Sequence, residues 1–340
     1  MDTSDIREAA SLGGESLRLK NYNRQLASLR KQTTPFGQTP SRRRISQSSP
    51  LQENADPQKI AFLLRKQWTL YSLTPMYRFS HDNFKEYSRL LNAFIAAEKQ
   101  KGVAVEVGEE LNFRVTFSAL LGMKGTQRDP EAFLVQILSK FQMSSKPAED
   151  RVVWTGWFCC TSGDSLLESI TEDFTCLPLF LANGAESNTA IVGTWFQRTF
   201  DCNFSRLKIS ALNLSWMAAL WSASSLDHHV VPLEFLWSVP CSPQSLDISY
   251  SIHPDDAKTL WNHVHKTLEE ITQEEVDLFI DCLCSHFHRH FKIHLSATRL
   301  VRVSTAIASA HTDGKIKILN SKYLTGVLAL LTELAIAEIQ

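Results

Sequence analysis

The sequence predicts an α+β protein in which a mixed, mostly antiparallel sheet is flanked by helices. Apolar or alternating runs of strand length fill the middle of the chain, and amphipathic helical periods stand near both of its ends. An Asp-Gly turn near residue 313, between two alternating runs, is typical of an antiparallel hairpin. We expect two lobes, an N-terminal α/β lobe over residues 56–150 and a strand-rich lobe over residues 151–340, preceded by a disordered tail over residues 1–55.

The tail differs from the rest of the chain in composition and charge. Residues 1–50 hold nine Lys and Arg against four acids, whereas the whole chain has a formal net charge of −1. A segment rich in Ser, Thr, Gln and Arg without an apolar period is typical of disorder. Candidate phosphorylation sites are Thr34, Thr39 and Ser49, each before a proline, and Ser46, which follows an arginine run. That run also suits nuclear import or a simple solvated charge cluster.

Three features indicate a soluble, intracellular protein. The N-terminus lacks the basic start and apolar run of a secretory signal. No stretch reaches the ~18 uninterrupted apolar residues that a membrane-spanning helix needs. The seven cysteines, an odd number without paired spacing, suit a reducing compartment.

In the first half of the chain, local signals predict helices and strands in alternation. A helix is expected to begin at Pro57, because Asp56 suits the cap and proline suits the first helical position. The further expected elements are an extended run over 69–79, a helix over 83–99, strands over 103–107 and 111–121, and a helix that begins at residues 129–131.

The second half reads as strand-rich and then helical. Strands are expected over residues 151–160, 174–181, 188–200, 230–239 and 245–252. Asn183-Gly184 predicts a hairpin turn between two of these strands. The run over 207–221 fits a strand or a helix equally well, and helices are expected over 254–266, 272–291 and about 321–339.

Catalysis is not expected. Gly163-Asp164-Ser165-Leu166 matches the block that opens one group of serine esterases, but such a serine needs a positioned histidine with a carboxylate behind it. Those enzymes keep the pair in an Asp-x-x-His block, which this sequence lacks. No glycine-rich phosphate loop occurs either, so no cofactor is expected.

Metal binding is also not expected, although one stretch is rich in ligands. On a helix, Cys282, His286 and His290 would share one face. A structural zinc site takes four ligands and usually draws two of them from a second element, and no Cys-x-x-Cys supplies them here. We interpret the stretch as an exposed polar face of a core helix.

Residues 298–319 predict a two-faced β-hairpin. A two-residue turn at Asp313-Gly314 would pair Thr312 with Lys315 and Ala310 with Lys317. One face then holds Val301, Val303, Ile307, Ile316 and Ile318, interrupted by Thr305, Ser309 and His311. The other face holds Arg302, Ser304, Lys315 and Lys317 among Ala306, Ala308 and Ala310, and Arg299 points with the apolar set or lies beyond it.

The cations of this hairpin have two interpretations. In the predicted register Arg302 lies roughly 26 Å from Lys317. A spread array of this kind suits a phosphate backbone, which is bound through Coulomb attraction and counterion release without sequence reading. The alternative is an ordinary solvated strand face, since lysine is common on exposed strands.

Several long blocks of the sequence closely resemble the vertebrate centromere protein L family. They include Lys66-Gln67-Trp68-Thr69-Leu70-Tyr71-Ser72-Leu73-Thr74-Pro75 and Trp154-Thr155-Gly156-Trp157-Phe158-Cys159-Cys160. The other blocks span residues 121–133, 177–188, 235–243 and 285–319. The resemblance covers about residue 55 to the C-terminus and leaves the tail aside.

The resemblance implies a non-enzymatic subunit of the inner kinetochore, located in the nucleus at the centromere, with a part in chromosome segregation at mitosis. It implies a heterodimer with centromere protein N, contact with centromere protein C and other inner-kinetochore subunits, and a basic channel that grips DNA next to the centromeric nucleosome. Carried onto this chain, the DNA-contacting positions are Arg151, Arg302, Lys315 and Lys317. The alternative is a pure protein–protein adaptor whose basic hairpin binds acidic partners.

Overall fold

The computed structural model confirms the α+β class. It describes residues 42–44, 56–100, 113–124, 126–141, 149–161, 171–224, 231–241, 244–266 and 270–339, and every strand pairing among them is antiparallel. The predicted strand over 103–107, Ser165 and the candidate phosphorylation sites lie outside the described residues. Within the predicted tail, Arg42–Arg44 forms strand β1, which pairs with β12 (Glu270–Thr272).

One large sheet joins strands from nearly the whole length of the described chain. In spatial order its strands are β11 (Leu246–Ile252), β10 (Leu233–Val239), β13 (Arg299–Ser304), β14 (Ala308–His311), β15 (Lys315–Ile318), β2 (Gln67–Leu73), β8 (Leu179–Gly184), β6 (Glu149–Cys159), β5 (Ala132–Phe141) and β4 (Phe113–Leu120). Strand β9 (Phe204–Arg206) also pairs with β2, and β3 (Met76–Tyr77) pairs with β7 (Phe174–Thr175). The division into lobes at residue 150 stays a prediction, and strands β5 and β6 pair with each other on its two sides.

Helices cover both faces of this sheet. They are α2 (Pro57–Leu63), α3 (Phe84–Gln100), α5 (Glu186–Phe200), α6 (Ala211–Ala223), α7 (Pro254–Val264), α8 (Gln273–Phe291) and α9 (Leu324–Ile339). Single 3-10 turns span His81–Asn83, Leu295–Ala297 and Ser321–Tyr323. None of the helices in the described ranges has the length and apolar character needed to cross a membrane.

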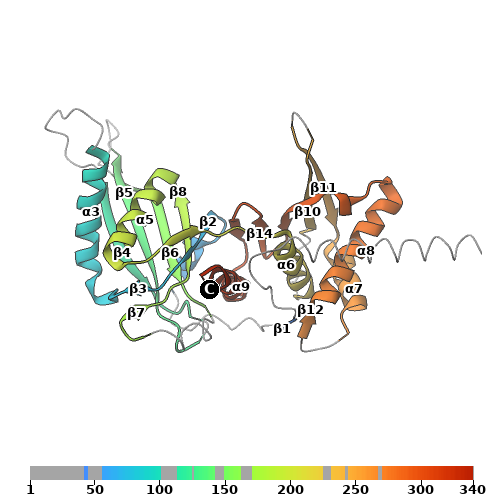
Figure 1. The fold of residues 1–340 in the computed structure, drawn as a ribbon, viewed down its shortest axis with the longest axis horizontal. Helices are drawn as coiled ribbons and strands as arrows, with labels where there is room; N and C mark the ends of the chain where they lie inside the picture. The colour runs from blue at the N-terminus through green and yellow to red at the C-terminus, as the bar shows by residue number, and fades with distance from the viewer. Residues whose placement is uncertain are drawn as a thin grey trace, which may run out of the picture. The chain divides into compact units, whose positions relative to one another are not determined.

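On one face, α3 and α5 lie along strands β4, β5, β6 and β8 (Figure 1). The core beneath them is largely aromatic, and the Phe133 and Phe158 rings stack with their centroids 4.4 Å apart. Phe180 and Phe196 contact the same Phe158 ring. Among the described residues, this hydrophobic cluster contains no side chain from β10, β13, β14 or β15, so the cover by α3 and α5 ends before those strands.

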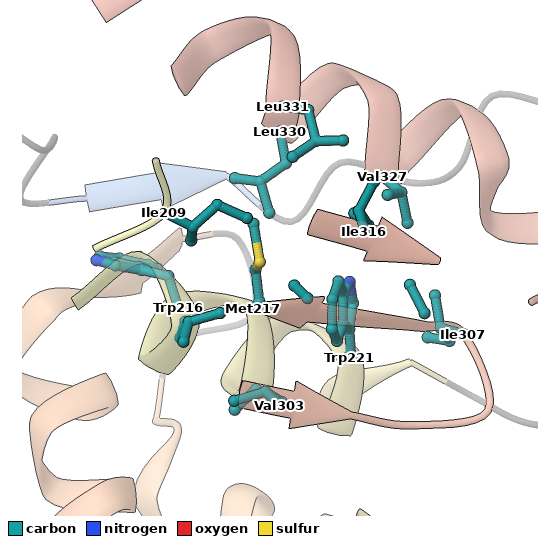
Figure 2. Close-up of a cluster of buried hydrophobic side chains, with 14 of the residues drawn as sticks. Ile209, Trp216, Met217, Trp221, Val303, Ile307, Ile316, Val327, Leu330 and Leu331 are labelled. Carbon is teal, nitrogen blue, oxygen red and sulfur yellow. The ribbon is translucent and has the colours of Figure 1, made fainter. Parts of the chain in front are cut away.

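On the opposite face, α6 and α9 pack on strands β13, β14, β15 and β2. Figure 2 shows Met217 and Trp221 of α6 and Val327 and Leu330 of α9 converging around Ile316 of β15. Ala308 and Ala310 of β14 are fully buried in the same cluster. Small residues on this strand leave room for the large side chains of α6.

Two predicted elements are wrong in type. The helix expected from residue 129 is strand β5, because its apolar side chains are buried on both faces, Phe133, Val135 and Ile137 on one and Leu134 on the other. The strand expected over residues 188–200 is helix α5, whose buried Val192, Phe196 and Phe200 recur at helical spacing. Both observed periods are present in the sequence, so each prediction is wrong about the period of the apolar pattern.

Two further signals are resolved differently from the expectation. Asn183-Gly184 ends strand β8 and leads into α5, so the predicted hairpin turn there is wrong. The undecided run over 207–221 is mostly helix α6. The Ser210 hydroxyl accepts a hydrogen bond from the Asn213 N–H at 3.1 Å and so caps this helix.

The predicted hairpin consists of three strands. Thr305 breaks its first strand, because its hydroxyl accepts the Ile307 N–H at 3.1 Å and its N–H donates to the Ala308 carbonyl at 2.9 Å. The turn between β14 and β15 has three residues, and His311 pairs with Lys315, so the predicted two-residue register is wrong. Gly314 in this turn has φ +78°, a conformation that favours glycine.

A compact polar network fixes the start of α8. Thr272 and Glu275 form a capping box, in which the Glu275 N–H donates to the Thr272 hydroxyl at 3.3 Å and the Thr272 N–H donates to the Glu275 carboxylate at 3.0 Å. The same carboxylate accepts the Lys266 N–H at 3.1 Å and lies 3.3 Å from Nδ1 of His265. Partial burial acts to raise the pKa of Glu275, but these hydrogen bonds outweigh it and hold the pKa below its ordinary value.

Glu275→Gln is expected to lower the free energy of unfolding by about 1 kcal/mol at neutral pH, since it weakens a capping box. A carboxyl whose pKa is lower in the folded chain stabilises the fold above its ordinary pKa of about 4.3, and that stabilisation is lost as the pH falls through the folded-state pKa. Urea unfolding at several pH values should therefore show the two proteins converging in acid. Glu274→Gln, an exposed change in the same helical turn, is the control and should leave stability within about 0.5 kcal/mol.

Gly314→Ala is expected to cost about 2 kcal/mol or more, because φ is positive and a Cβ there would collide with the backbone oxygen of Leu207. Gly326→Ala is the matched control within α9, where a Cβ would meet no atom within 4 Å. That change should stabilise the fold by about 0.5–1 kcal/mol through helix propensity. Thermal unfolding of both variants measures the contrast, and equal shifts in Tm would contradict the assigned turn.

Candidate nucleic-acid interface

Cationic side chains line the sheet face that α3 and α5 leave uncovered on β13, β14 and β15. Arg302 pairs with His311 across β13 and β14, and His311 pairs with Lys315 across β14 and β15. Paired residues point to the same side of a sheet, so these three side chains form one row across three strands, which we call the basic row. Lys317 lies two residues along β15 from Lys315 and shares its side of the sheet.

The predicted grouping of Arg302, Lys315 and Lys317 survives although the predicted register does not. The turn at 305–307 and the three-residue turn at 312–314 each reverse the side of the sheet on which the following residues were expected. For Lys315 and Lys317 the two reversals cancel, so both stay on the side of Arg302. Strand β14 lies between the two turns and is affected by the first reversal alone, so Ala308 and Ala310 are buried against the core. His311 and Ser309, expected on the apolar side, lie on the cationic side.

The cations are also closer together than the sequence predicts. Arg302 and Lys315 are separated by β14 alone, which corresponds to about 10 Å between backbones. Lys317 is offset by two residues, so it lies about 12 Å from Arg302 in place of the roughly 26 Å expected from one long strand. The result is a compact cluster.

Arg299 extends the same face because of a β-bulge. The pairing of β10 with β13 shifts between Leu236 and Trp237, which leaves Val301 as the extra residue. Arg299 therefore pairs with Ser238 and is exposed, while the neighbouring Leu300 is buried against the core with Trp237. We define the basic face as Arg299, Arg302, His311, Lys315 and Lys317.

Burial differs among these cations in a way that matters for binding. Lys317 is exposed, whereas Arg302 is half-buried beside Leu236 of β10. The Nε atom of Arg302 is buried and has no hydrogen-bond partner among the described residues. Any contact of Arg302 with an external oxygen atom therefore has to come from the Nη atoms of its guanidinium.

Asp313 contacts two members of the basic row. Its Oδ2 lies 2.7 Å from Nζ of Lys315, and its Oδ1 lies 2.7 Å from Nδ1 of His311. Partial burial acts to raise the pKa of Asp313, but the Lys315 hydrogen bond and the nearby His311 overcome it and hold the pKa below its ordinary value. Asp313 is therefore charged at neutral pH.

The turn that carries Asp313 is tied to the neighbouring chain. The Leu70 N–H donates to the Gly314 carbonyl at 2.8 Å, and the Ile209 N–H donates to the Thr312 carbonyl at 3.3 Å. Nε and Nη2 of Arg206 donate to the Asp313 carbonyl, both at 3.3 Å, and Nη1 of Arg206 pairs with Glu186 at 3.1 Å. These bonds hold the whole turn in place.

Arg151 lies apart from the basic face. It is exposed near the start of β6, and the β2 and β8 strands separate β6 from β15. Three strand spacings correspond to about 14 Å across the sheet. Its neighbour Asp150 pairs with Arg114 at 2.9 Å, and within the described residues Arg151 has no ion pair.

The other candidate chemistry gains no support from the geometry. The His286 ring shares a hydrogen bond with the Tyr250 hydroxyl at 2.7 Å, and it lies 4.6 Å from the ring of His290. Within the described ranges, no group of three or more His, Cys, Asp or Glu side chains is placed to hold a metal ion.

Sequence reasoning misses four residues of this region, namely Arg299, His311, Asp313 and Arg206. The bulge that turns Arg299 outward and the early turn that turns His311 outward have no glycine or proline to mark them. The sequence predicts only a turn role for Asp313, and Arg206 comes from a strand far away in the sequence.

Comparison with known proteins identifies the family. Residues 62–336 match the family model described as Centromere protein L. The Homo sapiens protein named Centromere protein L is 74% identical over 317 residues, which cover 93% of this chain and 92% of that protein. The Bos taurus and Danio rerio proteins of the same name are 69% and 45% identical, and they are aligned with 100% and 88% of this chain and over 100% and 82% of their own lengths. The chain therefore belongs to the centromere protein L family.

Proposed function

We propose that this chain is a non-enzymatic subunit of the inner kinetochore that uses its basic face to hold centromeric DNA. In this proposal it acts in the nucleus as a heterodimer with centromere protein N and contacts centromere protein C. Membership in the centromere protein L family supports the centromeric role. The compact cluster of Arg302, Lys315 and Lys317 on an uncovered sheet face supports the DNA contact.

The geometry fits a phosphate backbone better than a base edge. Duplex DNA carries one phosphate charge per ~1.7 Å of its axis, so the ~10 Å between Arg302 and Lys315 spans roughly six phosphates. Cations on a flat sheet reach phosphates without entering a groove, and such contacts position DNA but do not read its sequence. We therefore expect binding that is strong at low salt and indifferent to sequence.

Arg151 enters the proposal as a second point of contact. It lies on the same side of the sheet as Lys315, because the register runs from Lys315 through Thr69 and Ala182 to Gly156 of β6, and the bulge at Val153 keeps Arg151 on that side. Helix α5 covers β8 between the two on this side of the sheet, so Arg151 and the basic face would contact separate parts of one DNA segment. A partner subunit would then complete the channel around that segment.

The triple variant Arg302→Gln, Lys315→Gln and Lys317→Gln tests the proposal. In complex with centromere protein N, it is expected to bind a short DNA duplex more weakly than the wild type. The slope of log K against log salt should become shallower by about 0.9 for each phosphate that the variant no longer neutralises. Fluorescence anisotropy over a salt series measures both quantities.

Lys85→Gln, Arg89→Gln and Arg289→Gln together make the control, because they remove the same charge from exposed positions on α3 and α8. Both triple variants should co-elute with centromere protein N. Equal salt slopes for the two variants would contradict a DNA contact at the basic face and leave an adaptor for acidic proteins as the remaining role.

A further inference from the structure

An acidic residue, Asp313, lies next to the basic row and affects how strongly that row attracts DNA. Asp313 lies within 2.7 Å of cation-forming groups on both Lys315 and His311. Nδ1 of His311 lies 2.7 Å from Oδ1 of Asp313 and accepts the Asp313 N–H at 3.1 Å. One carboxylate thus spans two of the three members of the basic row.

The backbone of the Asp313 turn is held at three consecutive carbonyl groups, so the Cα atom of Asp313 stays near Lys315 when a ligand arrives. Thr312, Asp313 and Gly314 accept hydrogen bonds from Ile209, Arg206 and Leu70 respectively. Gly314 also packs so closely on the backbone of Leu207 that no Cβ would fit between them. The turn therefore keeps the Asp313 carboxylate within reach of Lys315 in the bound state.

The Lys315 ammonium group keeps its ability to bind while it contacts Asp313. It has three N–H donors, and one of them is directed at the carboxylate. A phosphate that reaches Lys315 then lies a few ångströms from a carboxylate of the same sign. At about 4 Å in water, the repulsion between two unit charges changes a binding constant about fivefold, and more where water is excluded.

We propose that Asp313 is a built-in electrostatic restraint that weakens the grip of the basic row on DNA. The inference rests on the proposed function of the basic face and names a residue that sets its strength. With Asp313 present, Lys315 adds little net charge, so firm binding depends on Arg302, Lys317 and the distant Arg151 together. A DNA segment that contacts only the turn is held weakly and can leave.

Asp313→Asn tests this restraint, because it removes the charge and keeps the shape and one acceptor oxygen. The full chain in complex with centromere protein N is titrated with a short DNA duplex, and binding is followed by fluorescence anisotropy. Asp313→Asn is expected to tighten binding about five- to tenfold at low salt. The gain should fade as salt is raised, because salt screens exposed charges.

Two further variants make the result decisive. Asp313→Ser, which also suits a turn, should give the same gain if the charge is responsible. Asp173→Asn makes the same charge change at an exposed position beside β7 and should leave binding nearly unchanged. If Asp313→Asn behaves like Asp173→Asn, or weakens binding by releasing Lys315, the restraint is overturned.

The double variant Arg302→Gln and Lys317→Gln in the same assay separates this inference from the proposed function. If the double variant weakens DNA binding while Asp313→Asn gives no gain, the basic face binds DNA and only the restraint is wrong. If neither variant changes DNA binding, the proposed function fails and the restraint fails with it.

Discussion

Strand β2 pairs with β15 on one side and with β8 on the other, and the rest of the architecture depends on this position. Trp68 fixes the strand, because it is fully buried, donates its Nε1–H to the Leu63 carbonyl at 2.9 Å and meets the Trp157 ring edge-on at 5.8 Å. The ladder joins the strands under α3 and α5 to those that carry the basic face. A change in the register of β2 would displace both the core under α3 and α5 and the core under α6 and α9.

The basic face is positioned by the hydrophobic core on the other side of the same strands. In β14 and β15 the alternate residues Ala308, Ala310, Ile316 and Ile318 are buried, which fixes the register within one residue. The residues that alternate with them must then point to the opposite side of the sheet, which carries the basic face. The core therefore also determines the arrangement of the cations.

The sequence predicts the fold class and most elements, because caps, helical periods and strand lengths are local signals. The α8 helix, for example, begins at a Thr-x-x-Glu box that is visible in the sequence. Strand β5 and helix α5 escape such reasoning, since each contains an apolar run that fits more than one period. For the candidate site, the residue types can be predicted and the spacing cannot. Lys315 and Lys317 alternate with isoleucines, so their common face is plain from the sequence. Their distance from Arg302 depends on the turn at Thr305, and the exposure of Arg299 depends on the bulge at Val301. No local pattern marks either feature. Arg151 is predicted from family resemblance alone, since a single basic residue at the start of a strand has no distinctive pattern.

The order of the strands has a consequence for synthesis of the chain on the ribosome. Strand β2 is complete at Leu73, but β15, its partner, ends only at Ile318. At about 5–20 residues per second, translation of the intervening chain takes roughly 12–50 s. The part of β2 around Trp68 lacks its β15 partner during that time, because β9 pairs only with the other end of the strand. The nascent protein is therefore a natural client for chaperones that shield unpaired strands.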